Sequence, residues 1–177
     1  GEFTLTPEWR REYVELCKAK EVTELDDNKK DFLFFTNQRG VDQVNVDGDY
    51  YDRIIDPVYE YYARRFDVKK IEVIKSKGGS NYNRVNEPDF VLCPSIRSKG
   101  FSESIDISTE LYSKNKPLHK NVSITLPEIR RFIDAYYNSV DFYKKLLEKY
   151  SPKAVFFVGF DFQFPLIQAA RSLGIKA

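Results

Sequence analysis

Histidine is nearly absent from this chain of 177 residues, which has only His119, and cysteine occurs only as Cys17 and Cys93. A single histidine excludes a metal site built from several imidazoles, and no metal site is predicted. Two cysteines do not form the disulfide framework of a small secreted protein, and a domain of this length folds without one. We therefore expect both thiols to be reduced and structural.

Long apolar runs and an excess of charge of one sign are also missing. The longest apolar run, Ala154 to Phe160, is far shorter than the roughly 20 residues that span a bilayer, and no signal peptide is visible. The 28 basic residues nearly balance the 27 acidic ones, which leaves a formal net charge of +1. Nucleic-acid-binding proteins usually carry a basic excess or a basic stripe, so a nucleic-acid partner is not predicted.

Aromatic residues, in contrast, are abundant, with 12 tyrosines and 14 phenylalanines. The simpler interpretation is a core rich in phenylalanine, with tyrosine at its margins. The alternative is that some tyrosines line a site for a sugar or a base, because aromatic faces suit such ligands.

Strand and helix patterns alternate after residue 30. Continuous apolar runs predict strands that are covered on both faces, as in parallel sheets, at 32–36, 71–74, 90–93 and 154–158. Apolar residues at steps of three and four predict helices over about 56–66, 104–113, 126–150 and 162–173. This alternation predicts an α/β fold, a three-layer α/β/α Rossmann-like domain with a mostly parallel sheet.

Two of these helices have predicted buried faces that the structure can test. In the helix that begins at Asp56-Pro57, the buried residues are expected to be Val58, Tyr61, Tyr62 and Phe66. In the long helix from Leu126, they are expected to be Ile129, Phe132, Ile133, Tyr136, Tyr137, Val140, Tyr143 and Leu147.

The two ends of the chain differ from the middle. Residues 1–30 are interpreted as a peripheral helix from about Pro7 to Lys20 and a charged linker, with residues 1–3 resembling a cloning remnant. Residues 31–177 form the Rossmann-like domain. Gly174 is a predicted helix cap, and Ile175 begins what resembles a further strand. The sequence therefore predicts a domain truncated at its C-terminal end, one half of a larger enzyme.

A polar segment from Asn37 to Arg53 directly follows the first predicted strand. Ligands of open parallel sheets bind where loops leave the carboxyl ends of strands, and long loops are often functional. The alternative is ordinary turn chemistry, in which Asp47-Gly48 forms a turn and Asp52 or Asp56 caps the next helix. The spaced acidic pattern of a calcium loop is missing.

A second loop of this kind, Gly159-Phe160-Asp161, follows the last predicted strand. Asp161 either caps the last helix or presents a carboxylate to the cleft, where it binds hydroxyls or acts as a base. The segment Lys77–Ser80 lacks the ending of a phosphate-binding loop, and no Gly-x-Gly-x-x-Gly motif follows any strand. No nucleotide cofactor is therefore predicted for this chain.

Two segments resemble a known family. Phe34–Arg39, followed by Val46–Arg53 and Asp56-Pro57, resembles the start of certain bacterial surface-polysaccharide biosynthesis proteins. Pro165–Lys176 resembles the helix-to-strand stretch that in those proteins leads into a Gln-His-Gly turn. They are glycosyltransferases of the GT-B fold, linked to capsule and lipopolysaccharide assembly. In that fold two Rossmann-like halves face each other across a cleft.

The resemblance implies the acceptor-side half of such an enzyme, with the nucleotide-sugar donor bound by the other half. A carboxylate of this half would deprotonate the acceptor hydroxyl, and the candidates for this base are Asp52, Asp161, Asp47 and Asp49. The residues expected to bind the acceptor are Asn37, Arg39, Tyr51 and Arg53.

The expected partner is a saccharide or a lipid-linked saccharide, and the expected location is the cytoplasm or the inner face of the membrane, with peripheral association through the whole enzyme. This chain alone is expected to be inactive. The alternatives are a non-catalytic Rossmann-like module that binds a ligand or a protein, and a small nucleotide-dependent enzyme of another chemistry.

Overall fold

The computed structural model describes residues 19–36, 43–74, 84–93, 103–114, 125–158 and 164–177. Its elements are η1 (Val22–Glu24), β1 (Phe32–Thr36), β2 (Gln43–Val46), β3 (Asp49–Asp52), α2 (Ile55–Ala63), β4 (Val68–Ile74), β5 (Asp89–Leu92), α3 (Glu103–Lys114), α4 (Leu126–Tyr150), β6 (Ala154–Phe157) and α5 (Phe164–Ser172). The helix predicted from Pro7 lies outside the described residues, except for its last two positions.

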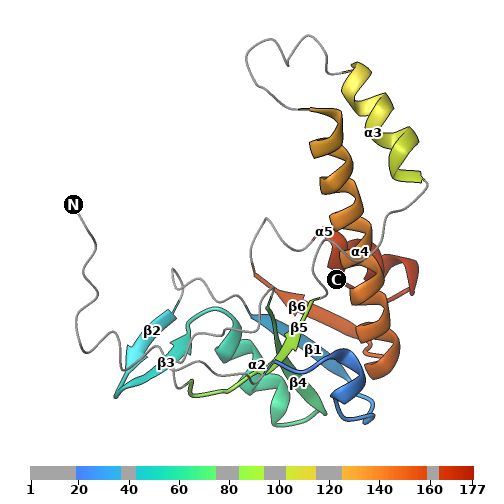
Figure 1. Cartoon of the computed structure of the whole chain (residues 1–177). Coiled ribbons are helices and arrows are strands. Elements are labelled where there is room, and N and C mark those ends of the chain that lie inside the picture. The colour runs from blue at the N-terminus through green and yellow to red at the C-terminus, as the bar shows by residue number, and fades with distance from the viewer. Residues whose placement is uncertain (1–18, 37–42, 75–83, 94–102, 115–124, 159–163) are drawn as a thin grey trace, which may run out of the picture.

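Four parallel strands form the central sheet, in the order β5-β4-β1-β6 (Figure 1). Numbered along the chain, these strands have the order 3-2-1-4, which is the order at the start of a Rossmann fold. In the register, Thr36 at the end of β1 lies opposite Glu72 of β4, and Phe35 lies opposite Phe157 of β6. The predicted α/β fold with a parallel sheet is therefore confirmed, and all four predicted strands are present.

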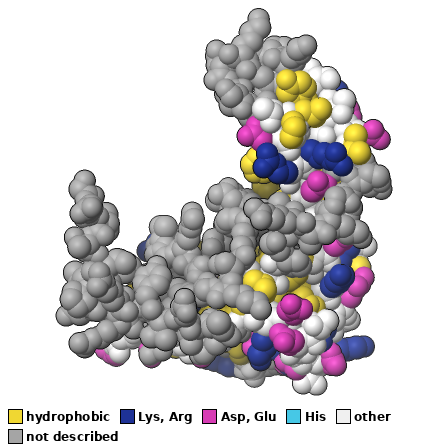
Figure 2. All heavy atoms as spheres, in the orientation of Figure 1, with side chains coloured by type: hydrophobic (Ala, Val, Ile, Leu, Met, Phe, Trp, Pro, Cys, Tyr) yellow, Lys and Arg dark blue, Asp and Glu magenta, His cyan; other side chains and the backbone are white. Residues whose placement is uncertain are grey.

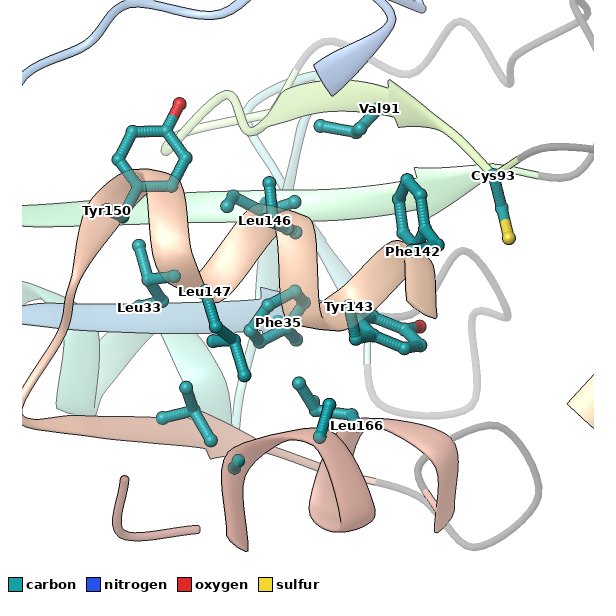
Figure 3. Close-up of a cluster of buried hydrophobic side chains, with 14 of the residues drawn as sticks. Leu33, Phe35, Val91, Cys93, Phe142, Tyr143, Leu146, Leu147, Tyr150 and Leu166 are labelled. Carbon is teal, nitrogen blue, oxygen red and sulfur yellow. The ribbon is translucent and has the colours of Figure 1, made fainter. Parts of the chain in front are cut away.

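One face of the sheet is covered by α4 and α5. Leu33 and Phe35 of β1 point to this face and pack in one core with Leu146 and Leu147 of α4 and Leu166 of α5 (Figure 3). All five side chains are at most 5% exposed. Burial of this order stabilises a fold by about 1.5–3 kcal/mol per large side chain, so this layer is the main source of stability.

The other face is covered by α2 and holds an aromatic layer. Phe34 of β1 stacks on Phe156 of β6 at 4.7 Å between ring centroids. Tyr62 of α2 lies edge-on to Phe32, at 4.9 Å. Because consecutive residues of β1 supply both faces, its apolar run is continuous, as the sequence predicted.

The predicted buried face of α2 is wrong at three of its four positions. These residues are exposed: Val58, Tyr61 and Phe66. The residues of α2 that are buried are Ile55 and Asp56. The prediction failed because a hydrophobic pattern does not mark a buried carboxylate, and Asp56 fixes which side of this short helix faces the sheet.

Helix α4 extends well beyond the sheet. Thr125 and Glu128 form a capping box at its first turn, and Ser151 ends it in a left-handed conformation, with φ 47°. Its 25 residues span about 37 Å at about 1.5 Å each, whereas the five residues of β1 span about 17 Å. A helix that connects two parallel strands runs back along the sheet, so the N-terminal half of α4 overhangs the carboxyl edge.

Together with α3, this half of α4 forms a projecting arm (Figure 1). The buried residues of α4 begin only at Val140, beyond this half of the helix. The prediction that Phe132 is buried is wrong, because that ring is 76% exposed. Hydrophobic side chains lie open on the arm (Figure 2), and those of the described residues are Ile105, Leu111, Leu126 and Phe132.

The chain ends beside β6. Gly174, with φ 70°, closes α5: its N–H donates to the carbonyl of Arg171, and the N–H of Ile175 donates to that of Ala170. This pair of bonds is a Schellman motif, so the predicted glycine cap is confirmed. Lys176 then forms a parallel bridge with Ala154, as expected for the start of a further strand.

The described residues before β1, from 19 to 31, are not a free linker. Lys20 forms a parallel bridge with Val91, so it lies along the outer edge of β5. Leu25 is 5% exposed and belongs to the main core, and the ammonium of Lys69 pairs with Asp26. The sequence analysis did not predict this contact, because Leu25 is a single apolar residue among many charged ones.

Candidate functional site

The sheet order places the switch point between β1 and β6. From β1 the chain continues to β4 on one side of it, and it later returns to β6 on the other side. Ligands of open parallel sheets bind at the carboxyl ends of two such neighbouring strands. The loop residues that follow both strands are outside the described part of the chain. This applies to three predicted site residues: Asn37, Arg39 and Asp161.

The predicted polar loop contains a hairpin, formed by β2 and β3. Asp47 and Gly48 make its two-residue turn, with φ 53° and 95°, and the N–H of Gly48 donates to Asn45 Oδ1 at 3.0 Å. Both turn residues have positive φ, which is why Asp-Gly is favoured here. Asp47 is therefore placed at the exposed tip of the hairpin, where the turn alone explains its presence.

The other predicted residues lie along β3 and just after it. Asp49 pairs with Val46 in the hairpin and is half-buried. The hydroxyl of Tyr51 donates to Glu60 Oε2 at 3.4 Å, and burial, together with nearby carboxylates, raises the pKa of this phenol. Tyr51 is thus held as a neutral donor. Arg53 is exposed.

Asp52, at the base of the hairpin, is the most enclosed of the candidate bases. Its side chain accepts three hydrogen bonds: Oδ1 from the N–H groups of Ile54 and Ile55, at 3.0 and 2.9 Å, and Oδ2 from the Thr36 hydroxyl, at 3.2 Å. The residue is 8% exposed. It caps the start of α2 as the alternative interpretation expected, and only Oδ2 retains an acceptor position.

Asp56 contacts both Asp52 and Lys70 of β4, and so links Asp52 to the sheet. The N–H of Asp52 donates to Asp56 Oδ2 at 2.7 Å, and the ammonium of Lys70 pairs with Asp56 Oδ1. Both side chains of this ion pair are at most 2% exposed. Breaking such a pair on one side leaves an uncompensated buried charge, so Lys70 and Asp56 hold the Asp52 segment on β4.

A second buried ion pair joins Glu72 of β4 to Arg84. Their side chains are 1% and 2% exposed, and the contact is made by Arg84 Nη1 and Glu72 Oε2. Burial raises the pKa of Glu72, against the opposing effects of Arg84 and Lys70. Arg84 is held in place by a bridge to Tyr50 of β3 and by the ring of Phe90, 5.7 Å from its guanidinium carbon.

These side chains form one polar cluster under the carboxyl ends of β1 and β4. We define it by six residues: Thr36, Asp52, Asp56, Lys70, Glu72 and Arg84. Of the seven buried polar or charged residues in the described segments, only Ser108 lies outside it. It contains two cations and three carboxylates, so it carries one negative charge in excess when all are ionised. Such a cluster binds donors or neutral hydroxyl groups better than anions.

Of the six members of the polar cluster, only Asp52 was a predicted site residue. Thr36 and Asp56 were noted as a strand end and a helix cap, and three members were not singled out at all: Lys70, Glu72 and Arg84. A signal for two of them exists, because Lys70 and Glu72 alternate with Ile71 and Val73 in a strand that has neighbours on both sides. Charged residues on the covered face of a central strand need buried partners. No comparable signal marks Arg84, which lies outside the strands.

The projecting arm carries a pocket on its half of α4. A pocket of about 330 Å³ is lined by Glu128, Arg131, Phe132 and Ala135, which share one face of α4. Glu128 is already engaged, since its Oε2 accepts from the backbone and hydroxyl of Thr125. Among the described lining residues, the guanidinium of Arg131, whose Nε donates to the carbonyl of Pro127, and the ring of Phe132 are the groups available to a ligand.

Within the described ranges, no group of three or more His, Cys, Asp or Glu side chains is placed to hold a metal ion. Among the helices described, none has the length and apolar character needed to cross a bilayer. Comparison of the chain with family models, with curated proteins and with solved structures found no match, so a functional assignment depends on the residues described above.

Proposed function

We propose that this chain is the acceptor-binding half of a glycosyltransferase that moves a sugar from a nucleotide-sugar to a bacterial surface-polysaccharide acceptor. One observation carries the proposal. The segments that resemble such enzymes, Phe34–Arg39, Val46–Arg53 and Asp56-Pro57, contribute Thr36, Asp52 and Asp56 to the buried polar cluster, at the carboxyl edge where open sheets bind ligands. A segment that only connected β1 to α2 would need no such cluster.

In this reaction the acceptor-binding half would hold the acceptor and accept one proton. An acceptor hydroxyl attacks the anomeric carbon of the donor sugar, its proton passes to a carboxylate, and the bond to the departing nucleoside diphosphate breaks. The candidates for that carboxylate are Asp52, Asp161, Asp47 and Asp49. Asp52 would act through Oδ2, because Oδ1 is occupied by two amide donors.

The arm supports an acceptor that is large or lipid-linked. Its pocket, with Arg131 and Phe132, lies on the half of α4 that overhangs the carboxyl edge. An aromatic ring suits the apolar face of a sugar or a lipid, and a guanidinium suits a phosphate. The proposed location is the cytoplasm or the inner face of the membrane.

Calorimetric titration of the 177-residue chain tests the assignment to the acceptor side. We expect saccharides, including phosphorylated ones, to bind, and nucleotide-sugars to bind weakly or not at all, because no phosphate-binding loop is recognised in the sequence. Tight and selective binding of one nucleotide-sugar would contradict the assignment, because the donor site would then lie in this half.

The second candidate is a non-catalytic module that binds a ligand, and one observation favours it. The carboxylate of Asp52 is already used by the fold, with three accepted hydrogen bonds. Sugar transfer by a protein that joins this chain to a donor-binding half separates the two candidates. Transfer supports the enzyme, and saccharide binding without transfer from any nucleotide-sugar supports the module.

A further inference from the structure

The ion pair between Glu72 and Arg84 is incomplete. Only Arg84 Nη1 and Glu72 Oε2 are in contact, although both side chains are almost fully buried. Three buried atoms of this pair have no hydrogen-bond partner among the described residues: Glu72 Oε1, Arg84 Nε and Arg84 Nη2. In the described part of the chain, one acceptor and two donor atoms of this pair therefore lack hydrogen-bond partners.

This arrangement is unusual for arginine and a carboxylate. The two groups normally pair through two parallel hydrogen bonds, which use both carboxylate oxygens. Buried polar groups are nearly always hydrogen-bonded, and the exceptions indicate an unseen water, ion or ligand. The unpaired atoms therefore indicate a position that a polar group fills.

The surroundings hold Arg84 in this pose. The N–H of Val85 donates to the carbonyl of Tyr50 at 3.1 Å, which fixes the backbone of Arg84 against β3. The ring of Phe90 lies against its guanidinium. Glu72 lies on β4 opposite Thr36, so the position is level with the end of β1 at the carboxyl edge.

The charge of the polar cluster limits what can bind. Two cations against three carboxylates leave no positive excess for a phosphate or another anion. A neutral hydroxyl group meets both needs, because its O–H donates to Glu72 Oε1 and its lone pairs accept from Arg84 Nε or Nη2. Neighbouring hydroxyls of one ring can use both nitrogens.

We infer that Glu72 and Arg84 together form a subsite for hydroxyl groups of a neutral sugar ring. The inference depends on the proposed function and names the class of acceptor group bound at this edge. Arg84 is a binding residue, and Glu72 both positions it and accepts from the sugar.

Nuclear magnetic resonance of the ¹⁵N-labelled chain tests the subsite directly, through the side-chain Nε–H signal of Arg84. The probes are the methyl glycosides of glucose, galactose, mannose and N-acetylglucosamine, with inorganic phosphate and glycerol as controls. We expect at least one glycoside to shift the Arg84 signal in a saturable manner, and the two controls to leave it unchanged.

The other outcomes overturn the subsite. A response of the Arg84 signal to phosphate identifies an anion site. Glycosides that shift backbone amides of residues 49–56 but not Arg84 place the sugar elsewhere and leave the proposed function intact. If no glycoside shifts any signal, solvent fills the position, and the proposed saccharide-binding function fails with the subsite.

Arg84→Lys supplies a second, independent measurement. Lysine keeps a positive charge beside Glu72 but lacks the two unpaired nitrogen donors, Nε and Nη2, so glycoside affinity should fall about tenfold or more. Arg64→Lys, at the exposed end of α2, is the matched control and should bind as the native chain does. Equal affinity in Arg84→Lys would overturn the subsite, and the titration of the native chain decides the question if the variant does not fold.

Discussion

The hydroxyl of Thr36 donates to Asp52 Oδ2 at 3.2 Å, which joins the last residue of β1 to the last residue of β3. The two residues are 16 positions apart in sequence, and both are at most 8% exposed. Through this bond and the helix cap at Ile54 and Ile55, one carboxylate ties together the central sheet, the hairpin and α2.

Asp52→Ala should destabilise the domain by about 2–4 kcal/mol. About 1 kcal/mol is the usual cost of losing a helix cap, and the rest comes from the Thr36 hydroxyl, which is left buried without its acceptor. Urea denaturation measures the change, with Asp49→Ala on the same strand as the control, at less than about 1 kcal/mol. Equal losses at the two positions would show that the buried link contributes nothing.

Asp52→Asn separates the role of Asp52 in the fold from a role in catalysis. Asparagine keeps the cap, so the free energy of unfolding should change by only about 1 kcal/mol. If Asp52 is the base, turnover by the enzyme that contains both halves should fall by about 10²–10⁴-fold. The same substitution at Asp47, Asp49 and Asp161 completes the set. Near-native turnover in all four variants would exclude every one of them as the base.

Lys70→Met should destabilise the domain by about 3–5 kcal/mol, because it leaves Asp56 as an unpaired buried charge. Adding Asp56→Asn to this variant removes that charge and should recover part of the loss. Thermal or urea unfolding of the two single variants and the double variant forms a thermodynamic cycle. Strictly additive losses would mean that the two side chains do not interact in solution.

Glu72 should make the domain less stable as the pH rises. Burial raises the pKa of this carboxyl in the folded state above its ordinary value of 4.5, so the folded chain holds a proton that the unfolded chain has lost. The free energy of unfolding therefore falls between about pH 4.5 and the folded-state pKa. Glu72→Gln lacks this dependence, and its stability relative to the native chain should increase across that range.

Denaturation of both chains at a series of pH values measures this difference, and carbon NMR of the Glu72 carboxyl gives the pKa itself. Glu110→Gln is the control, because Glu110 is exposed on α3 and its pKa is lowered by Lys114. A difference between Glu72→Gln and the native chain that stays constant from pH 4 to pH 8 would contradict the prediction.

Phe34→Ala should cost about 3–5 kcal/mol, the usual range for a fully buried phenylalanine, because this ring has no exposed surface. Phe156 stacks on it from β6 but is only half-buried, so Phe156→Ala should cost clearly less. Chemical denaturation of the two variants compares them. A larger loss at Phe156 would mean that β6, and not β1, is the better covered strand.

The sequence predicted the sheet well for a physical reason. Strands such as Phe32–Thr36 are buried on both faces, so nearly every residue carries the apolar signal. The same logic located β6, whereas the cap at Gly174 was predicted from the glycine itself, which adopts a positive φ without strain. The helical pattern failed for Phe132, because the period of an amphipathic helix predicts which face is buried but not where the supporting sheet ends.

The candidate site was only partly predictable. Asp52 and Asp47 were noted as polar residues after a strand, which is a local signal, and their roles as cap and turn follow from local chemistry. The partners Lys70, Glu72 and Arg84 depend on which strands lie side by side. The spacing of residues along the chain does not predict which strands pair, so the polar cluster could be recognised only in the structure.

Each of the two outer strands of the sheet forms a backbone bridge with a lysine. Lys20 bridges the free side of β5 and Lys176 bridges the free side of β6, and both residues are exposed. An open sheet edge is a template on which further copies of a chain add strand by strand into aggregates, and a lysine at the edge opposes this because the next copy would bring a like charge to the same place. Replacing these two lysines by apolar residues would therefore threaten solubility before it affected any ligand.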